Sequence, residues 1–200
     1  RQGMAVVAVA VNSLKDPLMR PGLEALIARH RPAVILNTTA FSAMGDDGTT
    51  VLDQADAPVL QVVLAGSALA AWEGSSRGLS PTDLAMNVVL PELDGRLLTR
   101  AISFKAEIAT DPRLEFSPVR HAPQPDRVDY VARLAAAWAR LRHTPRHERR
   151  LAIVLSDYPA RGGRTGYAVG LDTAASAAEI LNLLHGEGYD AGRDGWRVAD

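Results

Sequence analysis

The sequence predicts an α/β fold, a doubly wound and mainly parallel sheet that is followed by the start of a second α/β unit. Short apolar runs of strand length alternate with segments of helical periodicity, as in parallel sheets covered by helices. A long amphipathic segment at 126–142 follows a proline-rich stretch, and a further apolar run and helix come after it. Hydrophobic residues make up 47% of the 200 residues, which is enough for a sizeable core.

Four apolar or alternating runs predict the strands of the first unit. The run at 4–11, MAVVAVAV, has the continuous hydrophobicity of a strand that is buried on both faces. The runs at 33–36 and 58–65 predict the next two strands, and weak alternation over 97–108 predicts one or two more. Residues 37–57 form a long polar loop, and such loops at strand ends are often functional.

Two helices are predicted between these strands from apolar residues at helical spacing. Residues 20–30 place Leu23, Leu26 and Ile27 on one face, and residues 67–73 predict a second, short helix. The resulting alternation of strand and helix is the reason for predicting a doubly wound sheet.

A third helix carries the clearest start and stop signals in the chain. Ser80 is placed as an N-cap, with Pro81 at the first helical position and Asp83 able to complete a capping box. Pro91 has no N–H to donate, so it is expected to stop the helix. The polar turn that follows ends at Gly95, which can adopt a positive φ.

The chain is predicted to divide at a proline-rich connector. Residues 1–108 form the α/β domain that carries the LPELDG turn, and residues 109–125, with four prolines, form an extended connector. Residues 126–200 supply the amphipathic helix and the first strand, loop and helix of a second α/β unit, which is expected to be truncated. Its strand is predicted at 151–156 and its helix at 173–185.

Composition and charge argue against several classes of protein. The formal net charge of −1 gives no reason to expect binding to nucleic acid or an anionic membrane. No apolar run is long enough to cross a bilayer, and residues 1–11 lack the pattern of a signal peptide. Residues 120–150 carry eight arginines against three acids, a net charge of +5, but no nucleic-acid motif, so a solvated face is the simpler interpretation. We therefore expect neither nucleic acid nor a membrane as a partner.

The chain contains no cysteine, which rules out disulfides and thiolate metal sites and leaves His, Asp and Glu as possible ligands. This composition is compatible with a cytoplasmic location. The histidines have no metal-ligand spacing, and Pro145 interrupts the one pair that is four residues apart. The five are His30, His121, His143, His147 and His185.

The two acids of the polar turn, Glu92 and Asp94, are candidate catalytic residues. A carboxylate on a short turn after a capped helix has a fixed backbone, and it can accept a proton or attract a metal cation. The structural alternative is that these acids cap a neighbouring helix or pair with Arg96 or Arg100.

The residues around this turn resemble a known family. LPELDG at 90–95, preceded by GLSPTDLAMNVV, is similar to the signature of the large, porphyrinoid-binding subunits of the metal chelatases, and most similar to the cobaltochelatase branch. Further stretches agree with that branch: ILNTTAFS at 35–42, PVLQVVLAGSALAAW at 58–72, AISFK at 101–105 and LAIVLSDYPARGGRTGYAVGLDTAASAAEIL at 151–181. Members of the family are several times longer, so the resemblance implies an interior segment.

The resemblance also implies an activity and partners. Cobaltochelatase inserts Co²⁺, its substrate metal, into the tetrapyrrole hydrogenobyrinic acid a,c-diamide, a corrinoid precursor, in cobalamin synthesis. ATP is hydrolysed on separate AAA+ partner subunits, in agreement with the lack of an ATP-binding motif here. Glu92 becomes the leading catalytic residue and the one candidate for metal contact, because the matching glutamate belongs to the chelatase active site. The isolated chain is expected to be inactive without those partner and accessory subunits.

Two alternatives stay open at this point. The first is a magnesium chelatase large subunit, or a paralogue that acts on another tetrapyrrole. The second, of a different class, is a binding or scaffold module without catalytic residues, which a Glu92 side chain buried in a salt bridge away from any cleft would favour.

The resemblance gives the polar loop after the second predicted strand a role in substrate binding. The hydroxyls of Thr38, Thr39 and Ser42 could bind the amide and carboxylate periphery of a corrinoid precursor, with Phe41 against its ring. Gln61 is a further candidate for the same pocket. The alternative for the hydroxyls is that they satisfy the loop backbone.

A glycine-rich loop at 157–172 invites comparison with a phosphate-binding loop. The comparison fails because Arg164 and Thr165 stand where a lysine and a Ser/Thr would follow a glycine. We expect this loop to border the macrocycle instead, with Arg161 and Arg164 paired with substrate carboxylates.

Overall fold

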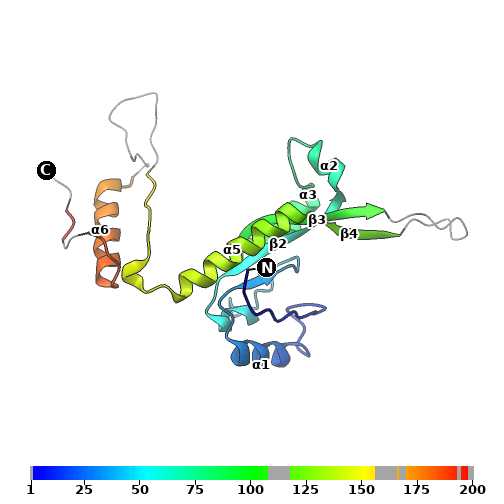
Figure 1. Ribbon diagram of the computed structural model, residues 1–200, viewed down its shortest axis with the longest axis horizontal. Helices are drawn as coiled ribbons and strands as arrows, with labels where there is room; N and C mark the ends of the chain where they lie inside the picture. The colour runs from blue at the N-terminus through cyan, green and yellow to red at the C-terminus, as the bar shows by residue number, and fades with distance from the viewer. Residues whose placement is uncertain (1, 108–117, 156–165, 167–169, 193–194, 198–200) are drawn as a thin grey trace, which may run out of the picture. The chain divides into compact units, whose positions relative to one another are not determined.

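The computed structural model describes residues 2–107, 118–155, 166, 170–192 and 195–197 (Figure 1). The chain divides into two compact units, residues 1–140 and residues 141–200, which are described separately. None of the described helices is both long and apolar enough to cross a membrane.

The first unit is built on a four-stranded sheet with the order β1-β2-β3-β4. The strands are β1 (Ile35–Asn37), β2 (Val59–Ala68), β3 (Leu97–Glu107) and β4 (Val119–Pro123). The first three are parallel, and β4 is antiparallel to β3. The predicted α/β class and mainly parallel sheet are therefore confirmed.

The register of the parallel strands decides which polar residues become neighbours. Asn37, the last residue of β1, lies opposite Gln61 of β2, which in turn lies opposite Leu98 of β3. Because β1 ends at Asn37, the chain leaves the sheet level with the beginning of β3, with β2 between the two strands. Residues 42–44 then come next to the turn that precedes β3.

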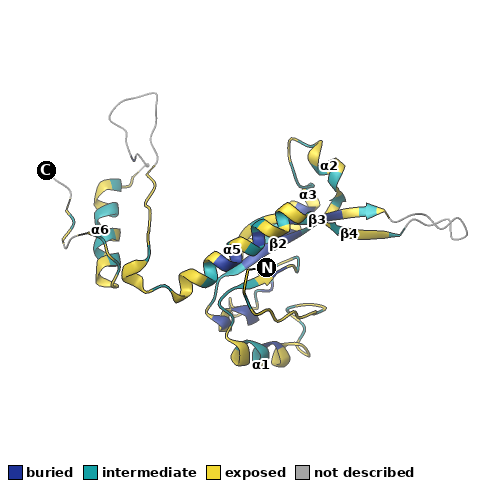
Figure 2. Ribbon diagram, in the orientation of Figure 1, coloured by how far each residue is buried: buried dark blue, intermediate teal, exposed yellow. Residues whose placement is uncertain are grey.

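The helices of the first unit agree closely with the sequence pattern. They are α1 (Arg20–His30), the 3-10 turn η1 (Val51–Ala55), α2 (Leu69–Glu73), α3 (Pro81–Leu84), the π turn η2 (Ala85–Val89), α4 (Leu90–Glu92) and α5 (Pro125–His143). Helix α5 buries Val131, Ala135 and Ala136 on one face, as the amphipathic pattern predicts. Figure 2 shows the buried residues concentrated on β2, β3, η1 and one face of α5.

Two apolar clusters hold the first unit together. One joins β2 to β3 through Val63, Ala65, Ala101 and Phe104, and partly buried residues such as Trp72 pack against it. The other joins α1 to η1 through Leu23, Val51 and Leu52, with Leu14, Ile27 and others packed around them.

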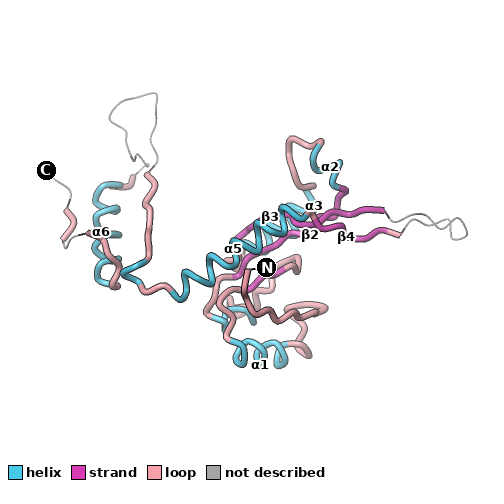
Figure 3. Tube along the Cα trace, in the orientation of Figure 1, coloured by secondary structure: helices cyan, strands magenta, loops and turns pink. Residues whose placement is uncertain are grey.

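The strand predicted at 4–11 is wrong. Residues 4–11 have no strand partner in the part of the chain that the structure describes, and Figure 3 draws the segment before α1 as loop. Val6 is 79% exposed, and Val11 at the end of the run packs against the cluster of α1 and η1. Continuous hydrophobicity identified a segment that could pair, but hydrophobicity does not by itself supply the backbone hydrogen bonds to a neighbouring strand that make a β-strand.

The predicted proline-rich connector at 109–125 contains a strand in its described part, whereas residues 109–117 lie outside the described residues. Residues 119–123 are β4, which is hydrogen bonded to β3, with Lys105 opposite His121. The following helix is also tied to the sheet, since Arg127 Nε donates to the carbonyl of Ala101 at 2.5 Å. The first unit therefore extends to residue 140, whereas the boundary predicted from the sequence lies before residue 126. An antiparallel edge strand tolerates prolines, because one side of it needs no donors.

The second unit contains the 3-10 turn η3 (Arg146–Glu148) and α6 (Thr173–Gly186). The predicted helix at 173–185 is confirmed, with Asp172 as its N-cap. The buried strand predicted at 151–156 is wrong over its described residues, because 151–155 pair with no other strand described here and Val154 is 90% exposed. Ser156 lies outside the described residues.

The predicted helix start at Ser80 is confirmed, and its cap also ties the helix to β2. The Ser80 side chain accepts from the N–H of Asp83, while the Asp83 carboxylate accepts from the Ser80 hydroxyl at 2.9 Å and from the N–H of Gly66 in β2 at 2.9 Å. Asp83 therefore links the helix to the sheet, and we call this pair of hydrogen bonds the Asp83 link. In a capping box the Asp83 carboxylate would instead accept from the backbone N–H of Ser80.

The predicted stop at Pro91 is displaced by one residue, because the helical path continues to Glu92. The π turn that precedes it gives the N–H of Leu90 to the carbonyl of Ala85. The carbonyl of Met86 is then left without a partner within the helix, since the next candidate donor is Pro91, which has no N–H. The N–H of Phe41 donates to it at 2.8 Å, so the proline and the π turn create an anchor for the 38–44 loop.

The Asp83 link predicts a measurable contribution of Asp83 to stability. Asp83→Ala leaves the Gly66 N–H without its acceptor and removes the helix cap, so the free energy of unfolding should fall by about 1–3 kcal/mol. Urea unfolding followed by circular dichroism measures this change. Asp46→Ala, at an exposed loop position, is the matched control and should stay within about 0.5 kcal/mol of the parent chain. Equal changes in the free energy of unfolding for the two substitutions would contradict a stabilising role for the Asp83 link.

Candidate functional site

A network of buried polar side chains lies where β1 ends and β3 begins. Asn37, Gln61 and Arg96 are all buried. The Asn37 amide donates to Gln61 Oε1 at 2.7 Å, and an Arg96 NH group donates to the same oxygen at 3.2 Å. The carbonyl of Thr39 accepts from all three side chains, at 3.0–3.3 Å. This convergence fixes the chain direction immediately after β1.

The Asp94 carboxylate fixes the next residues of the same loop. One oxygen accepts from the Ser42 hydroxyl at 2.5 Å and from the N–H of Met44 at 3.2 Å. The other accepts from the N–H of Ala43 at 2.7 Å and from Arg96 at 2.5 Å. The side chains of Asp94 and Arg96 are only 1% and 2% exposed. We call residues 39–44 the anchored loop.

The surroundings of Asp94 keep its carboxylate ionised. Burial alone would raise the pKa of Asp94, but the hydrogen bonds from Ser42 and Ala43 and the positive charge of Arg96 outweigh it and hold the pKa below its ordinary value. Two N–H groups, a hydroxyl and a guanidinium all donate to this carboxylate, so a proton there would displace one of the donors.

Phe41 is held at the tip of the anchored loop in an unusual conformation. Its φ is +65°, in the left-handed region that non-glycine residues rarely adopt. The hydrogen bond to the Met86 carbonyl and the Asp94 contacts on the following residues hold it there. The ring is not used to fill the core, since the residue is 53% exposed.

A pocket with a volume of about 640 Å³ lies against the anchored loop, and we call it the loop pocket. Its ten lining residues come from the turn before α1, the anchored loop and the helix that ends at Glu92: Asn12, Ser13, Leu14, Lys15, Thr39, Ala40, Phe41, Ser42, Ala43 and Leu90. The loop pocket therefore joins a preorganised loop to the helix end that carries the acidic turn.

Glu92 lies on the last turn of that helix and is exposed. Its side chain has no hydrogen-bond or ion-pair partner among the described residues, in contrast to Asp94 two positions later. Leu90, two positions earlier, lines the loop pocket. The two acids of the turn are thus in opposite environments, Asp94 buried and saturated, Glu92 solvated and free to react.

The structure brings three of the predicted substrate residues, Thr39, Phe41 and Ser42, to one pocket. Thr38 is exposed beside them on the same loop. Gln61 is different, because it is buried and its side-chain amide is used within the polar network. Arg161 and Arg164 lie outside the described residues. The binding and catalytic roles of all these residues stay predictions.

Sequence reasoning missed the importance of Arg96 and of the turn before α1. Arg96 entered only as one of two alternative partners for the acids, and nothing in its spacing distinguished it from Arg100. Its position as the first residue after the turn and before β3 is the signal that could have singled it out. The turn at 12–15 was not singled out, because a strand was expected immediately before it, at 4–11.

No group of three metal-ligating side chains occurs within the described ranges. His121 faces Ser103 across the β3–β4 pair, with Nδ1 3.3 Å from the hydroxyl. Glu92 stays a candidate for contact with a metal that arrives as substrate.

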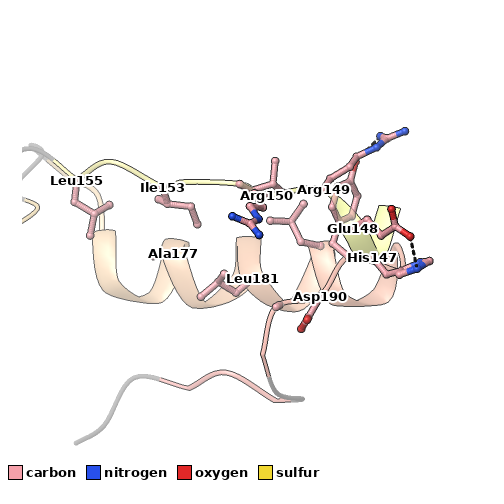
Figure 4. A pocket seen from close by; sticks show the side chains of 13 residues that line it. His147, Glu148, Arg149, Arg150, Ile153, Leu155, Ala177, Leu181 and Asp190 are labelled. Atoms are coloured by element: carbon pink, nitrogen blue, oxygen red, sulfur yellow. Dashed lines mark hydrogen bonds and ion pairs between the residues drawn. The ribbon is translucent and has the colours of Figure 1, made fainter. Parts of the chain in front are cut away.

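The second unit has its own pocket, of about 1000 Å³ (Figure 4). Leu155 and Ile153 from the extended segment face Ala177 and Leu181 of α6 across it. His147 and Glu148 lie at its other end, 3.6 Å apart. This lining is mostly apolar, and none of the predicted site residues belongs to it.

Comparison with known proteins places the chain in a family. Residues 1–197 match the family model described as CobN/Magnesium Chelatase. The chain belongs to this family. It is 45% identical to the aerobic cobaltochelatase subunit CobN of a Sinorhizobium species, over 96% of this chain and 15% of that protein.

Two further members of the CobN/magnesium chelatase family support the assignment. The aerobic cobaltochelatase subunit CobN of Pseudomonas aeruginosa is 41% identical, over 94% of this chain and 15% of that protein. The solved catalytic subunit of cobaltochelatase from Mycobacterium tuberculosis shares the fold with a TM-score of 0.69 and 33% identity, over 88% of this chain and 15% of its own. The chain thus spans about 15% of the length of these relatives.

The buried pair predicts a pH-dependent role for Asp94 in stability. Because the pKa of Asp94 is lower in the folded state, its ionised carboxylate stabilises the fold at pH values above the ordinary aspartate pKa of about 4. This contribution to the free energy of unfolding is lost as the pH falls through the lower, folded-state pKa. Asp94→Asn should therefore lower the free energy of unfolding by about 3–5 kcal/mol at pH 7, because it leaves Arg96 without its charge partner.

Urea unfolding at pH 7 and at pH 3 tests this expectation, with Glu92→Gln on the same turn as the control. The loss of stability caused by Asp94→Asn should be smaller at pH 3, because below the ordinary aspartate pKa of about 4 the unfolded parent chain binds a proton at this carboxylate. The stability of the control should differ little from that of the parent chain at either pH. A deficit of equal size at the two pH values would show that the charge of Asp94 does not stabilise the loop.

Proposed function

We propose that this chain forms part of the large subunit of an ATP-dependent cobaltochelatase, which inserts Co²⁺ into hydrogenobyrinic acid a,c-diamide in cobalamin synthesis. The support is membership of the CobN/magnesium chelatase family and the higher identities to proteins named as cobaltochelatase subunits. In this proposal ATP is hydrolysed by separate AAA+ partner subunits, which agrees with the lack of a nucleotide-binding motif in this chain.

Metal insertion sets clear chemical demands on the protein. Two pyrrole N–H protons must leave the macrocycle, and the metal ion must lose water as the ring nitrogens replace it. A carboxylate beside the macrocycle can accept a proton from the ring, attract the dication, or do both in sequence. Such a carboxylate has to be accessible to the ring and held in a fixed place.

The observation that carries the proposal is the position of Glu92. It is exposed and has no partner among the residues described, yet it sits on a turn whose next acid, Asp94, is locked to the anchored loop. Leu90 and the anchored loop line one pocket. A free carboxylate on a rigid turn, two residues after a leucine that lines the pocket, fits a proton acceptor, and Glu92 is the catalytic residue that we propose.

Asp94 then has a different role from Glu92. Its four hydrogen bonds leave it no capacity to receive substrate protons, and a lowered pKa makes it a weak base. We assign it the task of holding the anchored loop against the turn, so that Phe41 and Glu92 keep a constant separation.

Substrate contacts are proposed for the side of the anchored loop that faces the pocket. The exposed ring of Phe41 offers a flat apolar surface to a macrocycle. The Thr39 hydroxyl donates to Asn37 at 3.0 Å and the Ser42 hydroxyl donates to Asp94, so both can only accept from a ligand amide. Thr38 is exposed, and its hydroxyl can both donate a hydrogen bond to a ligand and accept one. Arg161 and Arg164 stay candidates for pairing with substrate carboxylates.

The two alternatives lead to different observations. A magnesium chelatase subunit belongs to the same family, and discrimination between the two metals needs an assay with each. A scaffold without catalytic residues would not need an exposed acid on a locked turn, and Glu92 has no salt bridge among the described residues that would explain it structurally.

The central test is Glu92→Gln in a full-length subunit that carries this sequence, assembled with its partner subunits. The amide keeps the shape and removes the base, so the rate of cobalt insertion should fall by about 10²–10⁴ while tetrapyrrole binding and stability are preserved. Glu73→Gln, an exposed glutamate on α2 outside the loop pocket, is the matched control and should keep the parent rate. Near-parental insertion by Glu92→Gln would make this carboxylate structural and overturn the proposal.

A second test concerns the chain alone. The described residues contain no group of three metal-ligating side chains, and the sequence contains no ATP-binding motif, so essential groups come from elsewhere in our proposal. The isolated 200 residues should give no cobalt insertion above a protein-free blank, measured by the absorbance change of the tetrapyrrole. Insertion above the blank would show that this region is sufficient by itself.

A further inference from the structure

The loop pocket carries a single formal charge. Of its ten lining residues nine are neutral, and Lys15 is the exception. The remaining surface combines the apolar side chains of Leu14, Phe41 and Leu90 with hydroxyls and one amide. A surface of this kind suits a ligand that is flat and apolar over most of its area and carries a negative charge at its edge.

Lys15 is held in place by a turn of fixed geometry. The Lys15 N–H donates to the Ser13 hydroxyl at 3.1 Å, and the Asp16 N–H donates to the Ser13 carbonyl at 3.3 Å. Leu14, between them, packs against the apolar cluster of α1 and η1. Two residues of the pocket lining, Lys15 and Phe41, therefore have a backbone that is held by hydrogen bonds.

The ammonium group of Lys15 is available to a ligand. The residue is exposed, and its side chain has no hydrogen-bond or ion-pair partner in the described part of the chain. Its neighbour Asp16 uses a carboxylate oxygen to accept from the N–H of Leu18 at 2.9 Å. An uncompensated cation in an otherwise neutral pocket attracts anions, and most strongly where the ligand excludes water.

We propose that Lys15 pairs with a carboxylate on the periphery of the macrocycle whose face lies against Phe41. The inference rests on the proposed function, and it adds a specific contact: the carboxylate of a ring substituent accepts from Nζ of Lys15, which belongs to the lining of the loop pocket. Lys15 thereby selects macrocycles with an ionised edge and sets the orientation of the ring in the pocket.

Binding of two model tetrapyrroles to a full-length subunit that carries this sequence tests the contact. Deuteroporphyrin IX offers ionised carboxylates, and its dimethyl ester offers the same ring without them. Lys15→Gln should weaken binding of the diacid by about tenfold and leave binding of the diester unchanged, while Lys15→Arg retains most of the diacid affinity. Lys105→Gln is the matched control, because Lys105 is the other lysine of this chain and lies exposed on β3, outside the pocket.

Covalent coupling gives a second readout. A carbodiimide activates a carboxylate of bound deuteroporphyrin IX, and a nearby amine displaces the urea to form an amide. Peptide mass spectrometry should find the porphyrin on Lys15 and not on Lys105 in the folded subunit.

The outcomes separate this inference from the function on which it rests. Equal diacid affinity of Lys15→Gln and the parent, or coupling at Lys105 in preference to Lys15, would overturn the Lys15 contact while tetrapyrrole binding itself persists. Failure of the parent subunit to bind either porphyrin would instead overturn tetrapyrrole binding by the loop pocket.

Discussion

Asp94 and Arg96 form an ion pair that is almost completely removed from solvent, and the geometry of the candidate site follows from it. A lone carboxylate or guanidinium at this depth would be strongly unfavourable, so each of the two needs the other and further hydrogen bonds. Asp94 obtains them from Ser42, Ala43 and Met44, and Arg96 reaches Gln61 and the Thr39 carbonyl. The anchored loop is thus fixed because it supplies the groups that make the buried charges tolerable. The Nε of Arg96 is the one buried nitrogen of this network without a hydrogen-bond partner, so the described residues do not supply an acceptor for every donor of the guanidinium.

The helix before the acidic turn contributes through a local defect. A regular α-helix would have used the Met86 carbonyl internally, but the π turn and Pro91 leave it open to the N–H of Phe41. Two independent anchors, one from a proline and one from a buried ion pair, therefore converge on six residues of loop. A rigid loop and a rigid turn are what a chelatase needs if its base and its ring-binding surface are to keep their separation while metal and protons exchange.

Several features could be predicted from the sequence because they depend on near neighbours in the chain. The helix at 20–30 and the amphipathic helix after the prolines follow from apolar spacing, and the start at Ser80 follows from its cap. The acids of the turn and the loop after β1 could be named as candidates from the sequence, since the family signature is a local string of residues. Errors arose where formation of an element depends on a distant partner. The apolar run at 4–11 lacks a strand to pair with in the described chain, whereas 119–123, inside the stretch predicted as a proline-rich connector, pairs with β3.

The sequence by itself determined the composition of the site: a glutamate and an aspartate two residues apart after a proline, a loop of hydroxyls and one phenylalanine, and a single lysine in the first hundred residues. Tertiary structure decided the environment of each of them. Parallel pairing of three strands placed Asn37, Gln61 and Arg96 in one buried network, and that network drew Asp94 inward. Glu92, two positions earlier on the same turn, was left in solvent. The two acids are indistinguishable as a sequence pattern, because the protonation and reactivity of a carboxylate depend on the charges and donors that the fold brings to it from elsewhere in the chain.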